Sequence, residues 1–245
     1  MVDLFRVAVG LVVSLAAAGL VLAFLAPGDT AEPPLRPAPE PANGPYLFLD
    51  RTPQGRPVGY DVCRPIHYVV NPAGQPPDGL ALIHDAVRMT EAASGFTFVD
   101  DGITDERPAQ GWRRARQPGR YGQGWAPVLI AWADHAEYPY IGGEDHAVGA
   151  GRSDPVTPEG PESKRYVTGQ IVLGRDGFAR ILDTEGGRLR ARSIVMHELG
   201  HVLGLGHVDD RGELMAQSNA RLNGFGPGDR KGFATLRANP CWPGG

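Results

Sequence analysis

The chain has 245 residues, of which 42% are hydrophobic, and a formal net charge of −4 at pH 7. This length suits one globular domain of ordinary size with appendages. The negative charge gives no reason to expect a nucleic-acid partner. The 34 glycines and 23 prolines predict a loop-rich fold with a proline-rich segment.

Residues 7–26 carry no charged side chain and follow Arg6. As a helix they would extend about 30 Å, the hydrocarbon thickness of a bilayer. We expect a transmembrane anchor here, with residues 1–6 in the cytoplasm and the rest of the chain extracellular. A cleaved signal peptide is the alternative, and the chain would then be secreted.

Residues 27–45 are rich in proline, alanine and glutamate. Such a composition favours an extended polyproline geometry and cannot form a hydrophobic core. We therefore expect a spacer, followed by one domain over residues 46–245.

The first part of this domain reads as alternating strands and helices. Residues 46–50 and 58–62 flank a turn and predict a small hairpin, and residues 66–70 predict a strand. Apolar residues then recur at helical spacing after Asp78, a predicted N-cap, up to Gly95. A strand over residues 96–99 would complete a right-handed βαβ unit.

Residues 102–124 form a polar stretch with an arginine cluster: Arg107, Arg113, Arg114, Arg116 and Arg120. Two interpretations are open, an anion-binding surface and a solvated insertion, and we favour the solvated insertion.

The apolar run 127–132 predicts a strand that is buried on both faces. Residues 147–151 predict a short edge strand and residues 166–173 a further strand. The loop between the first two strands holds five polar residues that could bind Ca²⁺ or a second zinc ion, although their spacing matches no firm metal pattern: His135, Glu137, Glu144, Asp145 and His146.

The sequence HELGHVLGLGH begins at His197 and lies on a predicted helix over residues 189–204. His197 and His201 are four residues apart and therefore share one face of the helix, where both imidazoles can bind one metal ion. Glu198 can reach a water molecule at the metal without being a ligand itself. Ligation requires neutral imidazoles, so we expect zinc and activity to fall in acid.

Gly204 follows His201 by three residues, and a left-handed glycine there would end the helix. The chain could then return His207 as a third ligand. Three protein ligands and one open position are typical of a catalytic zinc site. The alternatives are buried structural histidines and a zinc site that has lost activity.

These residues also carry a family resemblance. Residues 197–207 resemble the extended zinc signature of the metzincin metallopeptidases, and residues 213–215 stand where that clan has its Met-turn. Within the clan, the chain is most similar to the matrixins, in particular their short bacterial relatives.

The resemblance implies a metzincin-like mixed α/β domain with a mostly parallel sheet, an antiparallel edge strand, an active-site helix, a Met-turn and a C-terminal helix. It implies one catalytic Zn²⁺ on His197, His201 and His207, with Glu198 as general base and Met215 as the Met-turn. It also implies that the edge strand around residues 146–153 pairs with an extended substrate.

Three features depart from the animal matrixins. Val208 stands where they usually have serine, the prodomain cysteine motif is absent, and so is the His-x-Asp pattern of their second zinc site. After Val208, Asp209 and Asp210 could hydrogen-bond a ligand imidazole or the turn backbone.

Cys63 and Cys241 lie near the two ends of the predicted domain. A disulfide between them is favoured over two free thiols or a latency ligand, because Cys63 directly precedes a strand and has little slack to reach the metal. Near the C-terminus, Asp229 is expected to cap a last helix whose Phe233 and Leu236 face inward.

The sequence thus predicts a monomeric, membrane-tethered zinc endopeptidase that acts on protein or peptide substrates outside the cytoplasm. Two alternatives remain, a non-catalytic zinc-containing domain of the cell envelope and a hydrolase of cell-wall peptide crosslinks.

Overall fold

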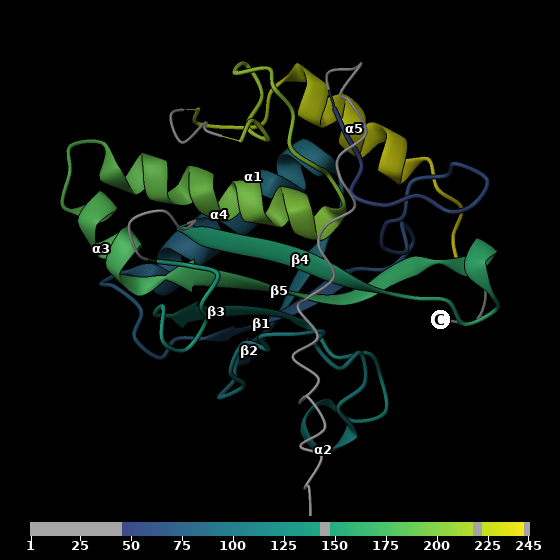
Figure 1. Cartoon of the computed structure of the whole chain (residues 1–245), viewed down its shortest axis with the longest axis horizontal. Helices are drawn as coiled ribbons and strands as arrows, with labels where there is room; N and C mark the ends of the chain where they lie inside the picture. Colours follow the sequence, from purple (N-terminus) through teal and green to yellow (C-terminus); the bar gives the residue numbers. More distant parts are fainter. Residues whose placement is uncertain (1–45, 143–147, 218–221, 243–245) are drawn as a thin grey trace, which may run out of the picture. The chain divides into compact units, whose positions relative to one another are not determined.

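A five-stranded sheet is the central element of the computed structural model, which describes residues 46–142, 148–217 and 222–242 (Figure 1). The predicted membrane span, 7–26, and the linker, 27–45, lie outside the described residues. Within the described ranges, no helix is long and apolar enough to cross a membrane.

The sheet has the strand order β2-β1-β3-β5-β4. Neighbouring strands are parallel except β4, which pairs antiparallel with β5 and forms one edge. The predicted mixed α/β fold with an antiparallel edge strand is therefore confirmed. The strands are β1 (Ile66–Asn71), β2 (Phe98–Ile103), β3 (Val128–Ala133), β4 (Gly149–Val156) and β5 (Arg165–Gly174).

Two long helices, α1 and α4, pack against each other on one face of the sheet (Figure 1). The short helices α2 and α3 were not predicted. The described helices are α1 (Gly79–Ser94), α2 (Pro118–Tyr121), α3 (Arg175–Leu182), α4 (Gly187–Leu203) and α5 (Pro227–Arg237), with a 3-10 turn at Pro161–Ser163.

The central strand β3 is buried along its whole length, as its apolar run predicts. Ile130 and Trp132 point into the large core beneath the helices, and Leu129 and Ala131 pack on Val69 on the opposite side of the sheet. Residues therefore alternate between two apolar layers.

Of the two residues predicted to bound α1, Gly95 has the expected role and Asp78 does not. Gly95 ends α1 in the left-handed conformation, with φ 74°. Asp78 precedes α1, but it has φ 58° and its side chain makes no capping hydrogen bond, so the predicted capping role is wrong. At α5, Asp229 accepts the backbone N–H of Gly226 at 3.0 Å and caps the helix from within its first turn.

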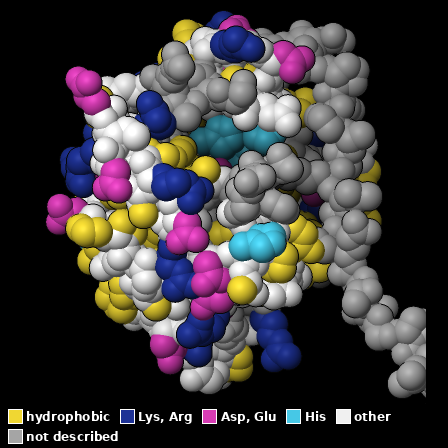
Figure 2. Space-filling model, turned by 60° about the vertical axis from the view of Figure 1, so that its left-hand side comes forward, with side chains coloured by type: hydrophobic (Ala, Val, Ile, Leu, Met, Phe, Trp, Pro, Cys, Tyr) yellow, Lys and Arg dark blue, Asp and Glu magenta, His cyan; other side chains and the backbone are white. Residues whose placement is uncertain are grey.

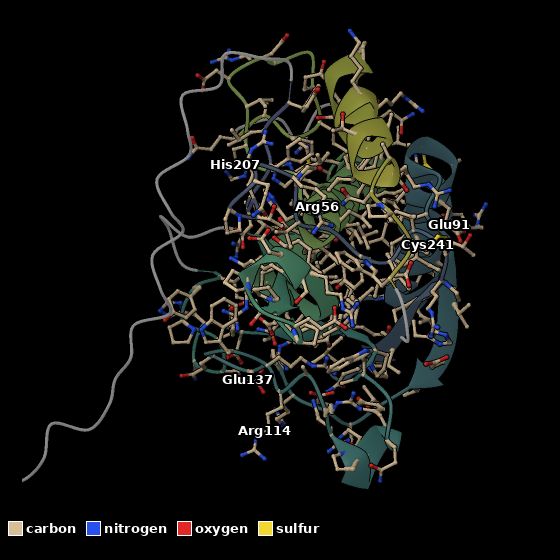
Figure 3. The ribbon with its side chains drawn as sticks, turned by 90° about the vertical axis from the view of Figure 1, so that its right-hand side faces the viewer. Arg56, Glu91, Arg114, Glu137, His207 and Cys241 are labelled. Atoms are coloured by element: carbon tan, nitrogen blue, oxygen red, sulfur yellow. A yellow bond between two sulfur atoms is a disulfide. The ribbon has the colours of Figure 1, made fainter. Side chains whose placement is uncertain are left out.

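One arginine of the predicted solvated loop is buried. The Arg113 side chain is 1% exposed and forms two hydrogen bonds to the Glu106 carboxylate, from Nε at 2.8 Å and from Nη2 at 2.6 Å. Its backbone N–H binds Asp154 on β4 at 2.9 Å. The solvated interpretation was thus wrong for Arg113. The other four arginines are exposed, and Arg114 projects away from the protein (Figure 3).

Cys63 and Cys241 form the expected disulfide, with Cα atoms 5.5 Å apart. The predicted hairpin of residues 46–50 and 58–62 is reduced to a tight turn. Its pairing consists of an isolated bridge between Arg51 and Pro57 and of hydrogen bonds from Val58 N to Asp50 O at 3.0 Å and from Thr52 N to Arg56 O at 2.8 Å.

Candidate metal centre

Helix α4 carries the first two histidines on its buried side. His201 is 1% exposed and Glu198 6%, so this segment lies inside the protein and not at its surface. Leu189, near the start of the helix, is 49% exposed.

Gly204 ends α4 and turns the chain back toward the helix. It has φ 116°, a conformation that a side chain would strain, and a Cβ at this position would lie 2.9 Å from the carbonyl oxygen of Val58. The sharp turn returns His207 to the same side as the two helical histidines, whose Nε2 atoms it faces.

The three imidazoles converge on one point. The Nε2 atom of His207 lies 3.1 Å from Nε2 of His197 and 3.0 Å from Nε2 of His201. All three candidate ligand atoms lie within 4.8 Å of one another. Histidine side chains are visible deep in a hollow of the molecular surface (Figure 2).

The opposite ring nitrogens of the two helical histidines face backbone carbonyls. His197 Nδ1 donates to Leu214 O at 2.7 Å, and His201 Nδ1 donates to Leu205 O at 2.8 Å. These bonds place the proton on Nδ1 in the neutral ring and leave the lone pair on Nε2. Two lone pairs therefore point at the position shared with His207.

This arrangement fits a zinc ion. Zn–N bonds of about 2.0–2.1 Å in a tetrahedron separate two ligand nitrogens by about 3.3 Å, close to the distances between these Nε2 atoms. A cation would relieve the mutual repulsion of the facing lone pairs. The three histidines were predicted from their spacing in the sequence, whereas the two carbonyls that orient His197 and His201 were not.

Glu198 lies between α4 and the edge strand. A Cβ on Gly149 would lie 3.0 Å from Glu198 Cγ and 3.1 Å from Oε1. At Gly151, a Cβ would overlap the Glu198 backbone. The two glycines therefore let β4 lie directly on the helix beside the candidate base.

Met215 packs against helix α4 at Gly200, next to His201 in the sequence. It is 1% exposed, and its Sδ atom occupies the space that a side chain at Gly200 would need. Val208 N donates to Met215 O at 3.1 Å, so this turn also holds the segment that carries His207.

Two buried carboxylates, Asp229 and Glu213, fix this turn, and neither was predicted to support the metal centre. Asp229 accepts the N–H of Leu214 at 2.7 Å, and Glu213 accepts the N–H groups of Gly228 and Asp229, both at 2.8 Å. Burial raises the pKa of Asp229 to about 6, and the nearby Glu213 charge adds to this rise. The two acids tie helix α5 to the residue whose carbonyl orients His197.

The other predicted polar residues are described by their own exposure and partners. Asp209 and Asp210 are exposed, and Asp210 accepts the N–H of Gly212 at 2.8 Å, as a turn-forming aspartate does. Glu137, one of the predicted calcium ligands, is paired with Arg107 at 2.5 Å and also with Arg175.

Another member of that group, His135, has a partner in its own loop. His135 Nδ1 is bonded to the carbonyl of Ile141 at 3.0 Å. Glu144, Asp145 and His146 fall outside the described residues.

Comparisons with known proteins agree with the resemblance. Residues 153–230 match the family model of the matrixins, and this segment includes the three histidines, Glu198 and Met215. Archaemetzincin from Methanopyrus kandleri is similar in structure, with a TM-score of 0.45 and 17% identity, over 69% of this chain and 93% of that one. A search of curated proteins gives no match. The match confirms the predicted resemblance to the matrixins over residues 153–230, and it supports a zinc metalloprotease.

Proposed function

Proceeding from the matrixin-like segment 153–230, we propose that the chain is a zinc-dependent endopeptidase. His197, His201 and His207 would hold the ion, and Glu198 would act as general base. The observation that carries this proposal is the convergence of three Nε2 atoms on one point, with two of the rings oriented by carbonyls.

A bound zinc ion would polarise the scissile carbonyl and lower the pKa of water, which makes hydrolysis feasible near neutral pH. Glu198 would take a proton from the attacking water and pass it to the leaving amine. Its position supports this role. Glu198 belongs to α4, the helix that carries two of the ligands, and its side chain lies against Gly149 of β4.

The edge strand would bind the substrate. β4 ends the sheet order and is paired along one side with β5. Its other side offers backbone donors and acceptors, which can pair with an extended peptide with little dependence on the peptide's sequence. Gly149 places this strand beside Glu198, so a peptide bound there would pass the candidate base.

We further propose that the domain acts outside the cytoplasm, tethered by residues 7–26. The Cys63–Cys241 disulfide supports this location, because disulfides persist mainly in oxidising compartments. Labelling of intact cells with a reagent that cannot cross the membrane tests the location. Protection of the domain from the reagent would contradict it.

The activity is tested with the full chain and a quenched peptide library. We expect cleavage that stops on chelation and returns with Zn²⁺. Glu198→Ala should keep the zinc and lose the cleavage. A chain that binds zinc but cleaves no peptide would instead be the non-catalytic domain that the sequence left open.

A further inference from the structure

The segment that carries His207 is bonded to a stretch of chain far away in the sequence. Leu49 N donates to Gly204 O at 2.9 Å, and Gly206 N donates to Leu47 O at 2.8 Å. Phe48 and Leu205 form an antiparallel bridge between these two bonds. We refer to residues 47–49 as the N-terminal strap.

The same segment is bonded on its other side to the Met-turn. Val208 N donates to Met215 O at 3.1 Å, and Val208 and Ala216 form a parallel bridge. The chain from residue 204 to residue 208 is therefore the middle member of a three-stranded arrangement, with the strap on one side and the Met-turn on the other.

The strap reaches two of the three candidate ligands through one short segment. Its partner Leu205 presents the carbonyl that accepts the Nδ1–H of His201 at 2.8 Å. Its partner Gly206 directly precedes His207. A shift of residues 205–206 would thus move one imidazole and remove the hydrogen bond that orients another.

Side-chain packing reinforces the backbone pairing. Phe48 is 8% exposed and belongs to the large core. At Gly206, a Cβ would lie 2.9 Å from Cδ2 of Leu47 and 3.3 Å from its Cγ, so the strap lies against the glycine backbone. Gly206 has no positive φ to explain it, and the close approach of Leu47 accounts for the glycine.

Residues 205–207 belong to no helix or strand of the described structure, so no element of their own fixes their position. A metal ligand on such a segment depends on its neighbours for preorganisation, and groups that orient ligands typically affect metal affinity by about 10–100-fold.

We propose that the N-terminal strap is a positioning element of the metal centre. With the strap docked, His207 is held at the point where His197 and His201 converge; with the strap displaced, the third ligand is lost more readily and the ion escapes. This inference rests on the proposed zinc site and adds that the site's retention of metal depends on residues about 155–160 positions earlier in the chain.

The first test is a size exchange across the contact in the full chain. Gly206→Ala should push Leu47 away and raise the rate of zinc loss to excess chelator by about 10-fold. Adding Leu47→Ala makes room for the new methyl group, so the double variant should release zinc nearly as slowly as Leu47→Ala alone. Thermal unfolding by circular dichroism shows that each variant is folded.

The second test removes one hydrogen bond and does not depend on the first. Leu49→Pro deletes the N–H that binds Gly204 O, whereas Leu49→Ala, the matched control, keeps it. We expect faster zinc loss for the proline variant only. Cobalt substitution adds a spectroscopic readout, because loss of an imidazole ligand changes the visible absorption of bound Co²⁺.

The results of these tests distinguish a failure of the strap's positioning role from a failure of the proposed zinc site. Equal rates of zinc loss in all folded variants and the unaltered chain would overturn the strap's role and leave the zinc site standing. Failure of the double variant to recover would also count against it. An unaltered chain that binds no zinc would overturn the proposed function, and the strap's role with it.

Discussion

Met215 packs against the backbone of Gly200 so closely that its Sδ atom would lie 2.4 Å from a Cβ on the glycine. Gly200 stands next to His201 and three residues after His197 on the same helix. The methionine thus packs directly under the turn of α4 that presents both imidazoles, which explains a glycine in the middle of a helix despite its low helix propensity.

Replacing Gly200 by alanine should bring the new methyl group into conflict with the Met215 side chain. Gly200→Ala would gain about 1 kcal/mol of helix propensity but lose about 1–3 kcal/mol to overpacking, with displacement of the Met-turn. Denaturant unfolding should show lower stability in the Met215 background. In a Met215→Ala background, where the sulfur is gone, the same change should be stabilising. Stabilisation in both backgrounds would show that the two residues do not compete for space.

Buried Arg113 and its exposed neighbour Arg114 allow a comparison of stability effects within one loop. Arg113→Ala would leave the Glu106 carboxylate in a largely buried position without its cation, and we expect a loss of about 3–5 kcal/mol in the free energy of unfolding. Its neighbour Arg114 is exposed, so Arg114→Ala should change stability by less than about 0.5 kcal/mol. Similar losses for the two variants would contradict the buried ion pair.

Part of this site could be predicted from sequence because its geometry follows from the helical period. The spacing of His197 and His201 specifies one helix face, and Gly204 specifies where the helix ends. The carbonyls of Leu214 and Leu205 could not be predicted, because every residue has a carbonyl and only the fold decides which one an imidazole meets.

Long-range partners were also missed. Residues 46–50 were predicted to form half of a hairpin. Alternation of apolar and polar residues indicates that a segment is extended, but it does not indicate which other segment pairs with it. Arg113 looked like its exposed neighbours, because its burial follows from a carboxylate seven residues earlier and from Asp154 on the edge strand.

The pKa of Asp229 predicts a pH dependence of stability. Its value rises from 3.8 to about 6 on folding, so between these pH values the folded state binds more protons than the unfolded state. Stability from this group is therefore present at low pH and is lost as the pH rises through about 6, by about 2–3 kcal/mol.

Asp229→Asn removes this dependence. Both chains should be unfolded in denaturant without metal, so that zinc release does not contribute. The stability of the native chain relative to the variant should fall as the pH rises from 4 to 6 and stay constant above that. A relative stability that rises over this interval would contradict the raised pKa.

The disulfide closes a loop between residues 178 positions apart in the sequence. The chain-entropy relation gives roughly 5 kcal/mol for a loop of this length. Replacing Cys63 and Cys241 by serine should lower the free energy of unfolding by up to this amount. Zinc content under folding conditions should not change, because the bridge is not one of the groups that hold the histidines. Loss of the zinc in a folded double variant would show otherwise.

Whether three imidazoles hold one zinc ion is decided by the metal content of the purified full chain. We predict one zinc ion per chain, a much lower content in folded His207→Ala, and no change in the control His67→Ala, whose imidazole is paired with Asp101 on the sheet. A chain without zinc, or one in which His207→Ala retains it as firmly as the control, would contradict the account.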